Sequence, residues 1–256
     1  MHPGAWLVWA LCAGIMAILT TNPFYLVPLA AVAWFVYASC HGDHPALRSF
    51  RVFALFGAAA LVTRTVLVVF GPIQTGSVLT ALLEGLRVAV LLMVFGAFNS
   101  VVDPYRALKL APRRVHEPAL AAALALSIAP RYVEAGARVR EAQRLRGIDV
   151  RRWRSLAALA VPVLETGMEE ALTLAESMDA RGHGRGPRSR YRPEPFGWRS
   201  LLVVAASAAA LATFALAGNG DLLIATAPLS WPSVSWVQSG AVLAMALPAL
   251  IPQRAR

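Results

Sequence analysis

The chain has 256 residues, of which 57% are hydrophobic and only 15% are charged, and its mean hydropathy is +0.57. This composition argues against a soluble globular protein. Twenty-four basic residues against 14 acidic ones give a formal net charge of +10, which favours anionic or acidic partners. The two cysteines, Cys12 and Cys40, are too few for a disulfide framework or a cysteine-ligated zinc site.

Six apolar segments are candidate membrane helices, because a hydrocarbon core of about 30 Å is crossed by roughly 20 apolar helical residues. The first two are short, and the polar turn at residues 20–23 predicts tilted helices or a shallow hairpin. No Lys or Arg precedes the first segment, which argues against a secretory signal peptide. The six segments are 5–19, 24–39, 52–70, 78–98, 201–217 and 234–251.

The positions of the arginines predict the orientation of these segments, since positively charged loops stay on the cytoplasmic side. The loops at 20–23, 71–77 and 218–233 contain no Lys or Arg, whereas 18 basic residues lie between positions 103 and 199. Six crossings with both termini in the cytoplasm satisfy the rule, and an odd number would break it. We therefore expect a multi-pass protein of the cell membrane.

Residues 99–200 differ from their apolar flanks because they hold most of the charge. The predicted organisation is membrane helices at 1–98, a cytoplasmic region at 99–200 and further membrane helices at 201–256. Residues 119–129 are apolar but too few to cross a membrane, which predicts a buried or interfacial helix. Pro130 predicts a helix start or a kink. The expected fold class is all-α: a polytopic integral membrane protein with a cytoplasmic pair of amphipathic helices.

Two amphipathic helices are predicted within the cytoplasmic region, because apolar residues recur there at spacings of three and four. The first ends at Arg146-Gly147, and the second starts near Pro162 and ends at Arg181-Gly182; glycine is the residue best able to take a left-handed cap. Glu141 and Glu176 each precede an arginine by five residues, so the two ends repeat at an offset of 35. The predicted apolar stripes are Ile128, Tyr132, Ala135, Val139 and Ala142 in the first helix, and Leu164, Met168, Ala171, Ala175 and Met178 in the second.

An arginine at the C-terminal end of a helix suits the negative end of the macrodipole, and its planar fork of donors stays free for an acidic groove on another protein. The alternative is that Arg-Gly merely ends a helix well, since both residues are common there. Two copies, each closing an amphipathic cytoplasmic helix, favour the docking role.

The paired arginines belong to a wider set of motifs that covers essentially the whole chain. These motifs are His2-Pro3, Asn22-Pro23, Asp103-Pro104, Pro130-Arg131, Arg138, Arg140, Ala142-Gln143, Arg146-Gly147 and Ala180-Arg181-Gly182. Their order resembles the transmembrane T component of energy-coupling factor (ECF) transporters, the family that includes the CbiQ-type cobalt-transport proteins.

In that family two cytoplasmic coupling helices carry an X-Arg-X signature, and each inserts its arginine into a groove of one ATPase subunit. The resemblance implies that Leu145-Arg146-Gly147 and Ala180-Arg181-Gly182 are the ATPase-coupling residues. One departure is Leu145, where the family often has alanine. The candidate supporting residues on the coupling helices are Arg138, Glu141, Gln143 and Glu176.

The chain contains no phosphate-binding GxxxxGK[ST] loop, and its single lysine, Lys109, has no glycine near it. HExxH and GxSxG motifs are absent too, so we expect no enzyme activity and no cofactor. The resemblance implies that ATP-driven closure of two partner ATPase subunits moves the coupling helices. A small-molecule-binding S component in the membrane would then release a micronutrient inward, such as a vitamin or a cobalt or nickel ion.

Arg64, Glu84 and Arg87 lie within predicted spans, where charges are costly and usually face a bundle interior or a wet cavity. One interpretation is a hinge or a contact with the S component. The other is structural: Glu84 pairs with Arg87, while Arg64 extends to the interface or bonds to a neighbouring helix. The sequence leaves both open, and it does not identify the transported compound or the number of S components.

Residues 182–199 contain five arginines among glycines and prolines. Because this segment precedes a membrane helix, we expect it to lie along anionic lipid rather than bind nucleic acid. His41, Asp43 and His44 have metal-ligating side chains, but their position in a short polar connection favours an ordinary loop, and we expect no metal site. The rival to the transporter hypothesis is a stand-alone basic membrane protein that binds anionic lipid through its cytoplasmic region and has no ATPase partner.

Overall fold

The computed structural model of the chain describes residues 1–39, 46–68, 75–108, 110–112, 115–147, 156–183, 196–217 and 233–251. Every regular element in these ranges is a helix, which confirms the predicted all-α class. The chain divides into two compact units. The first comprises Met1–Leu110 and Glu194–Arg256, and the second comprises Ala111–Pro193, which lies within the region predicted to be cytoplasmic.

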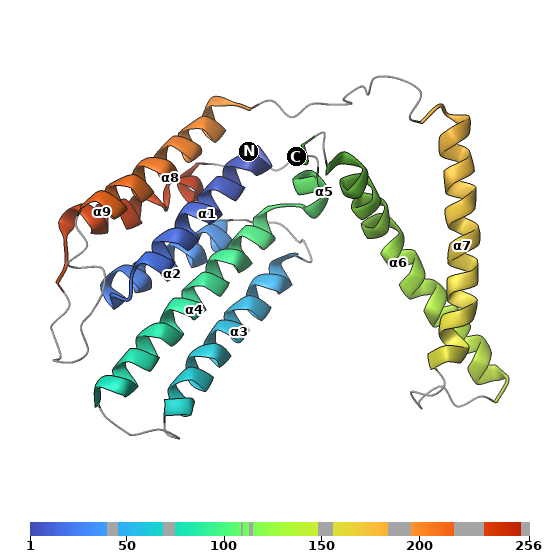
Figure 1. Cartoon of the computed structure of the whole chain (residues 1–256), viewed down its shortest axis with the longest axis horizontal. Coiled ribbons are helices and arrows are strands. Elements are labelled where there is room, and N and C mark those ends of the chain that lie inside the picture. The colour runs from blue at the N-terminus through green and yellow to red at the C-terminus, as the bar shows by residue number, and fades with distance from the viewer. Residues whose placement is uncertain are drawn as a thin grey trace. The chain divides into compact units, whose positions relative to one another are not determined.

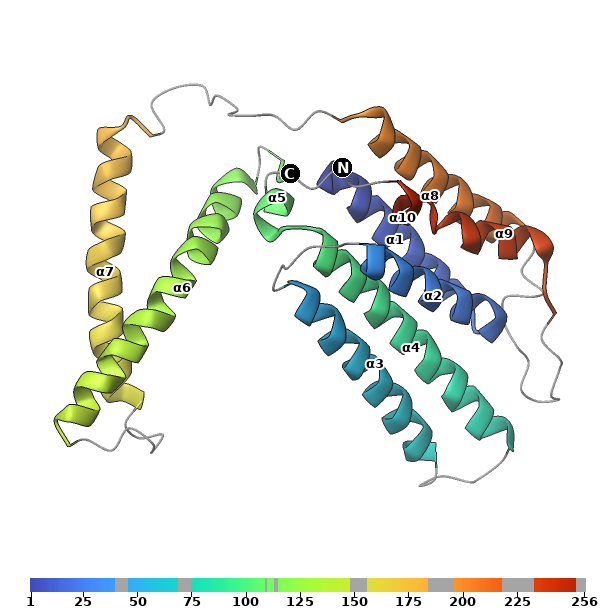
Figure 2. The same cartoon turned by 180° about the vertical axis from the view of Figure 1, so that it is seen from behind.

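The first unit is built from long apolar helices (Figures 1 and 2). Segments long and apolar enough to cross a membrane are Phe50–Leu67 in α3 (Ala46–Leu67), Gly76–Val101 in α4 (Thr75–Val101), and α8 (Trp198–Leu216). The helices α1 (Pro3–Leu19) and α2 (Pro23–Ser39) are also apolar, but 17 residues give each a length of only about 25 Å. This set of helices makes the chain a multi-pass membrane protein.

Polar residues fix the turn between α1 and α2. The Asn22 amide donates to the Thr20 hydroxyl at 3.0 Å, and the Phe24 amide donates to Asn22 Oδ1 at 3.0 Å. Pro23 is the first residue of α2, where no backbone donor is needed. The Asn22 side chain also donates to the Ser233 carbonyl at 2.8 Å, which ties this turn to the last part of the described chain.

The core of the first unit joins the N-terminal helix to helices from the C-terminal part of the chain. α1 packs along α8, and the His2 amide donates to Ser200 Oγ at 3.0 Å. Both α1 and α2 also pack against α4. Burial of large side chains from several helices holds the unit together, and those fully buried include Trp9, Met16, Tyr25, Leu29 and Phe214.

α3 packs chiefly along α4, and glycines let the two backbones approach closely. A Cβ atom on Gly57 would lie 3.1 Å from the Ala89 Cα atom, and one on Gly85 would lie 3.0 Å from the Leu61 Cα atom. Most of the α3 surface faces away from the unit: only 11% of Phe50–Leu67 is buried. Figure 2 shows α3 at the edge of the unit, beside α4.

The sixth predicted segment, 234–251, is not one continuous helix. It forms α9 (Trp236–Ala244) and the single turn α10 (Leu247–Leu250), separated by Met245 and Ala246. Pro248 explains the break, because a proline ring clashes with the carbonyl four residues earlier, and that residue is Ala244, the last of α9. The Trp9 indole donates to the Met245 carbonyl at 2.9 Å and so satisfies an acceptor at the break.

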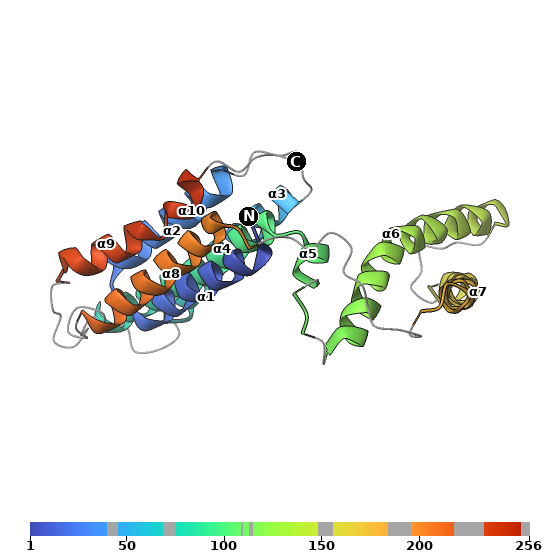
Figure 3. The ribbon, with the colours of Figure 1, turned by 90° about the horizontal axis from the view of Figure 1, so that it is seen from above.

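The second unit is an antiparallel pair of long helices, α6 (His116–Leu145) and α7 (Leu156–Ala180) (Figure 1). The sequence predicts a helix start or a kink at Pro130 and a helix start near Pro162. Both prolines lie inside these helices, so the predicted start at Pro162 is wrong and the kink is the alternative that holds for Pro130. The short α5 (Pro104–Leu108) belongs to the first unit. Figure 3 shows that α6 bends along its length, as expected of a helix that contains a proline. The apolar stretch 119–129 is therefore the first part of α6 and not a separate helix.

Candidate functional site

The C-terminal end of α7 has the full hydrogen-bond pattern of a Schellman cap. The Gly182 amide donates to the Asp179 carbonyl at 2.8 Å, and the His183 amide donates to the Met178 carbonyl at 3.0 Å. Gly182 has a φ of 77°, the left-handed conformation that glycine adopts without steric cost. Arg181 therefore occupies the C-cap, the residue directly after the last residue of α7.

α6 also ends in a left-handed glycine turn, after Arg146. The Arg146 amide donates to the Ala142 and Gln143 carbonyls, and the Gly147 amide donates to the Arg144 carbonyl at 3.0 Å. Gly147 has a φ of 74°. The predicted left-handed glycine caps are confirmed at both ends, so each arginine occupies the C-cap of an amphipathic helix.

The side chains around both caps lie on the surface. Four of the six coupling residues are exposed: Arg146, Gly147, Ala180 and Arg181. Leu145 is 85% exposed, and Gly182 is partly exposed. Among the candidate supporting residues, Arg138, Glu141 and Glu176 are exposed. Gln143 is half-buried, and its Oε1 atom is buried without a hydrogen bond to any residue that the structure describes.

The two arginine caps lie at opposite ends of the helix pair. α6 and α7 run antiparallel, and Tyr132 in the middle of α6 contacts Gly167 in the middle of α7. Arg146 follows the end of α6 and Arg181 follows the end of α7, so the structure separates these residues instead of gathering them into one site.

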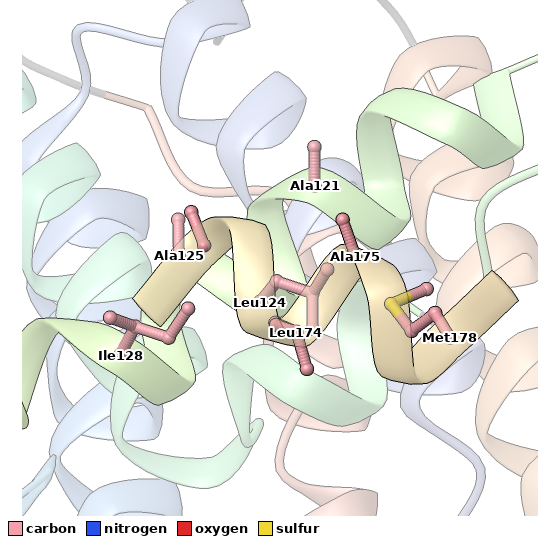
Figure 4. Close-up of a pocket in the computed structure, with 8 residues that line it drawn as sticks. Ala121, Leu124, Ala125, Ile128, Leu174, Ala175 and Met178 are labelled. Carbon is pink, nitrogen blue, oxygen red and sulfur yellow. The ribbon is translucent and has the colours of Figure 1, made fainter. Parts of the chain in front are cut away.

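An apolar cavity of about 340 Å³ lies between α6 and α7 (Figure 4). Its lining residues precede Tyr132 in α6 and follow Gly167 in α7, so it lies on the side of the Tyr132 contact that leads toward Arg181. It confirms part of the predicted stripes, because Ile128, Ala171, Ala175 and Met178 line it. Leu164 and Met168 of the same stripe do not line it, and they remain 65% and 67% exposed. The cavity is completed by Ala121, Leu124, Ala125 and Leu174.

The charged residues of the first unit pair differently from the predicted arrangement. Glu84 forms an ion pair with Arg64 of α3, and Arg64 Nε donates to Glu84 Oε2 at 3.0 Å. Arg87 Nε instead donates to the Thr20 carbonyl at 3.2 Å. A bond to a neighbouring helix is confirmed for Arg64, whereas the Glu84–Arg87 pair is wrong: the close approach of α3 gives the carboxylate a partner on another helix.

The described residues contain no group of three or more His, Cys, Asp and Glu side chains placed to hold a metal ion. Two features predicted from the sequence lie outside the described residues. They are the polar connection with His41, Asp43 and His44, and the arginines of the segment that follows His183 up to residue 195.

Residue spacing does not predict the contact between Tyr132 and Gly167. It places Tyr132 in the apolar stripe of its helix and gives no role to Gly167. A usable signal was present, because the 35-residue offset that relates Arg146 to Arg181 also relates Tyr132 to Gly167. The Trp9 contact at the break in the last segment was missed as well, and no local pattern marks it.

Fold and site together define a class: a multi-pass α-helical membrane protein that carries an antiparallel helix pair with an Arg-Gly cap at each end. The family model described as "CbiQ: Cobalt transport protein" matches residues 1–191. The chain belongs to this CbiQ family of cobalt transport proteins.

Two curated relatives match part of the chain. The energy-coupling factor transporter transmembrane protein EcfT of Brevibacillus brevis is 33% identical over 100 residues, which are 36% of this chain and 38% of the relative. An uncharacterized protein of Mycoplasma genitalium is 34% identical over 104 residues, which are 38% of this chain and 25% of the relative. The matched regions thus span between a quarter and two fifths of the length of these relatives.

Proposed function

We propose that this chain is the transmembrane scaffold and energy-coupling subunit of an ECF-type importer. It transmits ATP-driven motion from two cytoplasmic ATP-binding-cassette subunits to a membrane S component, which takes up a vitamin or a cobalt or nickel ion. Membership of the CbiQ family and the similarity to a protein named EcfT support this assignment. The chain itself is not the ATPase, since its sequence has no phosphate-binding loop.

The observation that carries the proposal is the pair of exposed arginine C-caps at opposite ends of α6 and α7. Each guanidinium stands at the negative end of a helix macrodipole and has donors available for carboxylates on a partner. Two separate docking points suit two ATPase subunits. Leu145-Arg146-Gly147 meets one subunit and Ala180-Arg181-Gly182 meets the other, with Arg138, Glu141, Gln143 and Glu176 supporting them.

Energy passes through the helix pair in this proposal. ATP brings the two ATPase subunits together, and the docked arginines move with them. The apolar seam between α6 and α7 carries that displacement toward the membrane helices, and the S component then releases its cargo. Residues 99–200 form the cytoplasmic part, flanked by membrane helices at 1–98 and 201–256.

The direct test replaces Arg146 and Arg181 together with alanine. We expect the ATPase subunits co-expressed with the chain to be lost from its purified complex, because both docking points are gone, while the amount of chain in the membrane is unchanged. The measurement is the ratio of ATPase subunits to chain after affinity purification.

The matched control replaces Arg188 and Arg190, which follow the helix pair in the sequence and lie outside the motifs; this change removes the same total charge. This pair should leave the complex intact. Equal retention of ATPase subunits by both double variants would contradict the proposal.

The alternative function is a stand-alone basic membrane protein that binds anionic lipid through its cytoplasmic region. The net charge of +10 is the observation that favours it. Lipid binding depends on the number of arginines and weakens with salt whichever of them are removed. Under this alternative the two double variants lose equal amounts of binding to vesicles containing phosphatidylserine.

A further inference from the structure

Two pairs of residues in the second unit share one spacing. Tyr132 and Gly167, which touch where α6 crosses α7, are 35 residues apart, and so are Arg146 and Arg181. Each helix therefore has the same number of residues between the crossing and its arginine. At 1.5 Å per residue, each arm is about 21 Å long. Because the helices are antiparallel, the arms extend in opposite directions from the crossing (Figure 1).

The crossing is a close contact between the two helices of the second unit. Among the residues of this unit whose burial the structure describes, only Gly167 is buried. A Cβ atom there would lie 2.6 Å from Tyr132 Oη, 2.9 Å from Cζ and 3.0 Å from Cε1. Tyr132 Oη also donates to the Gly167 carbonyl at 3.3 Å. In the position that it occupies here, the Tyr132 ring leaves no room for a Cβ atom at residue 167.

Away from the crossing, the described side chains of the unit remain partly or fully exposed. On one side of the crossing lies the alanine-lined cavity, and on the other Val161 and Leu164 are 64% and 65% exposed. Pro130 and Pro162 both precede the crossing, so the arms that lead to the arginines contain no proline. Each arm is an uninterrupted helix between one contact and one cap, and a displacement at the cap is carried to the crossing without a break.

We propose that Tyr132 seated on Gly167 is the fulcrum of an equal-armed lever that sets the separation of Arg146 and Arg181. Its use in energy coupling rests on the proposed function, but the geometry does not. Tyr132 and Gly167 are positioning residues: they touch no partner and act through the arginines at the two ends. A pair of ATPase subunits related by a two-fold axis fits this lever, because each subunit meets an arm of equal length.

The test measures the separation of the arms directly. Spin labels are attached to cysteines that replace Glu141 and Glu176, which are exposed and equally far from the crossing, in a chain whose Cys12 and Cys40 are changed to alanine. The distance between the two labels is measured in the full chain, in lipid nanodiscs, by pulsed electron paramagnetic resonance. We expect one narrow distance distribution for the otherwise unchanged chain. Gly167→Ala should shift its mean by several ångström, because the added Cβ atom displaces the tyrosine ring.

Gly136→Ala is the matched control, since a Cβ atom there meets nothing within 4 Å. It should leave the distribution unchanged. Adding Tyr132→Ala to Gly167→Ala should return the mean toward its original value, because the clash is gone, but with a broader distribution. Circular dichroism checks that helix content is retained in every variant.

The proposal is overturned if Gly167→Ala and Gly136→Ala give the same distribution, or if Tyr132→Ala alone leaves the distribution as narrow as before. These outcomes are independent of ATPase binding. Arg146→Ala with Arg181→Ala should leave the distance unchanged. Retention of the ATPase subunits by that variant would contradict the proposed function and leave the lever standing.

Discussion

At the scale of single residues, the ends of α6 and α7 depend on two glycines in the left-handed conformation. Gly147 and Gly182 have φ values of 74° and 77°, and a Cβ atom at either position would meet no neighbour within 4 Å. The requirement for glycine is thus conformational and not a matter of space. It places each arginine where the helical hydrogen bonds end, with its side chain directed into solvent.

Replacing Gly182 with alanine should therefore loosen the end of α7. A non-glycine residue in the left-handed conformation costs about 1 kcal/mol, which corresponds to roughly fivefold faster hydrogen exchange at the cap. The amide to follow is that of His183, which donates to the Met178 carbonyl. Gly136→Ala should have the opposite effect and stabilise α6 by up to about 1 kcal/mol, since alanine is the better helix former. Unchanged exchange at His183 would show that the cap does not need the positive φ.

At the scale of helices, the sequence predicts the elements well where a local signal exists. The apolar segments and the Arg-Gly ends are read directly from spacing and from turn chemistry. Partners between helices are harder, because they depend on which elements meet. Nothing near Glu84 shows that α3 brings Arg64 to it, and nothing near Met245 shows that the Trp9 indole supports the break in the last segment. Both contacts join residues far apart in the chain.

The ion pair between α3 and α4 gives an asymmetric prediction. Arg64→Leu leaves Glu84, well inside α4, without its charge partner, which should destabilise the first unit by about 2 kcal/mol. Glu84→Leu should cost less, because Arg64 lies near the end of α3 and its long side chain can reach the interface. The double leucine variant should recover most of the loss. Thermal unfolding in detergent measures all three; equal effects of the two single variants would contradict this account.

At the scale of the whole molecule, the distribution of charge and the helices give complementary information. The helices show a multi-pass membrane protein, while the orientation still rests on the arginines of the sequence. Because the last segment is split into α9 and α10, a count of long helices alone does not fix the side of the membrane on which each terminus lies. Both termini are expected in the cytoplasm.

A labelling experiment tests this orientation. A cysteine replacing Ala180, which is exposed at the end of α7, should react with a membrane-impermeant maleimide in inside-out vesicles and remain unlabelled in intact cells. The background lacks Cys12 and Cys40. A cysteine replacing Thr21, in the turn after α1, should show the reverse preference. Labelling of position 180 from outside intact cells would refute both the orientation and the proposed access of the ATPase subunits.

The packing of α1 against α8 has a consequence for biosynthesis. During synthesis α1 can pack against α8 only after α6 and α7 have been made, since both lie between α1 and α8 in the chain. The His2–Ser200 hydrogen bond spans the same interval. The helices of the first unit therefore complete their packing late in synthesis. A nascent chain that stops after α7 lacks the α8 surface against which α1 packs.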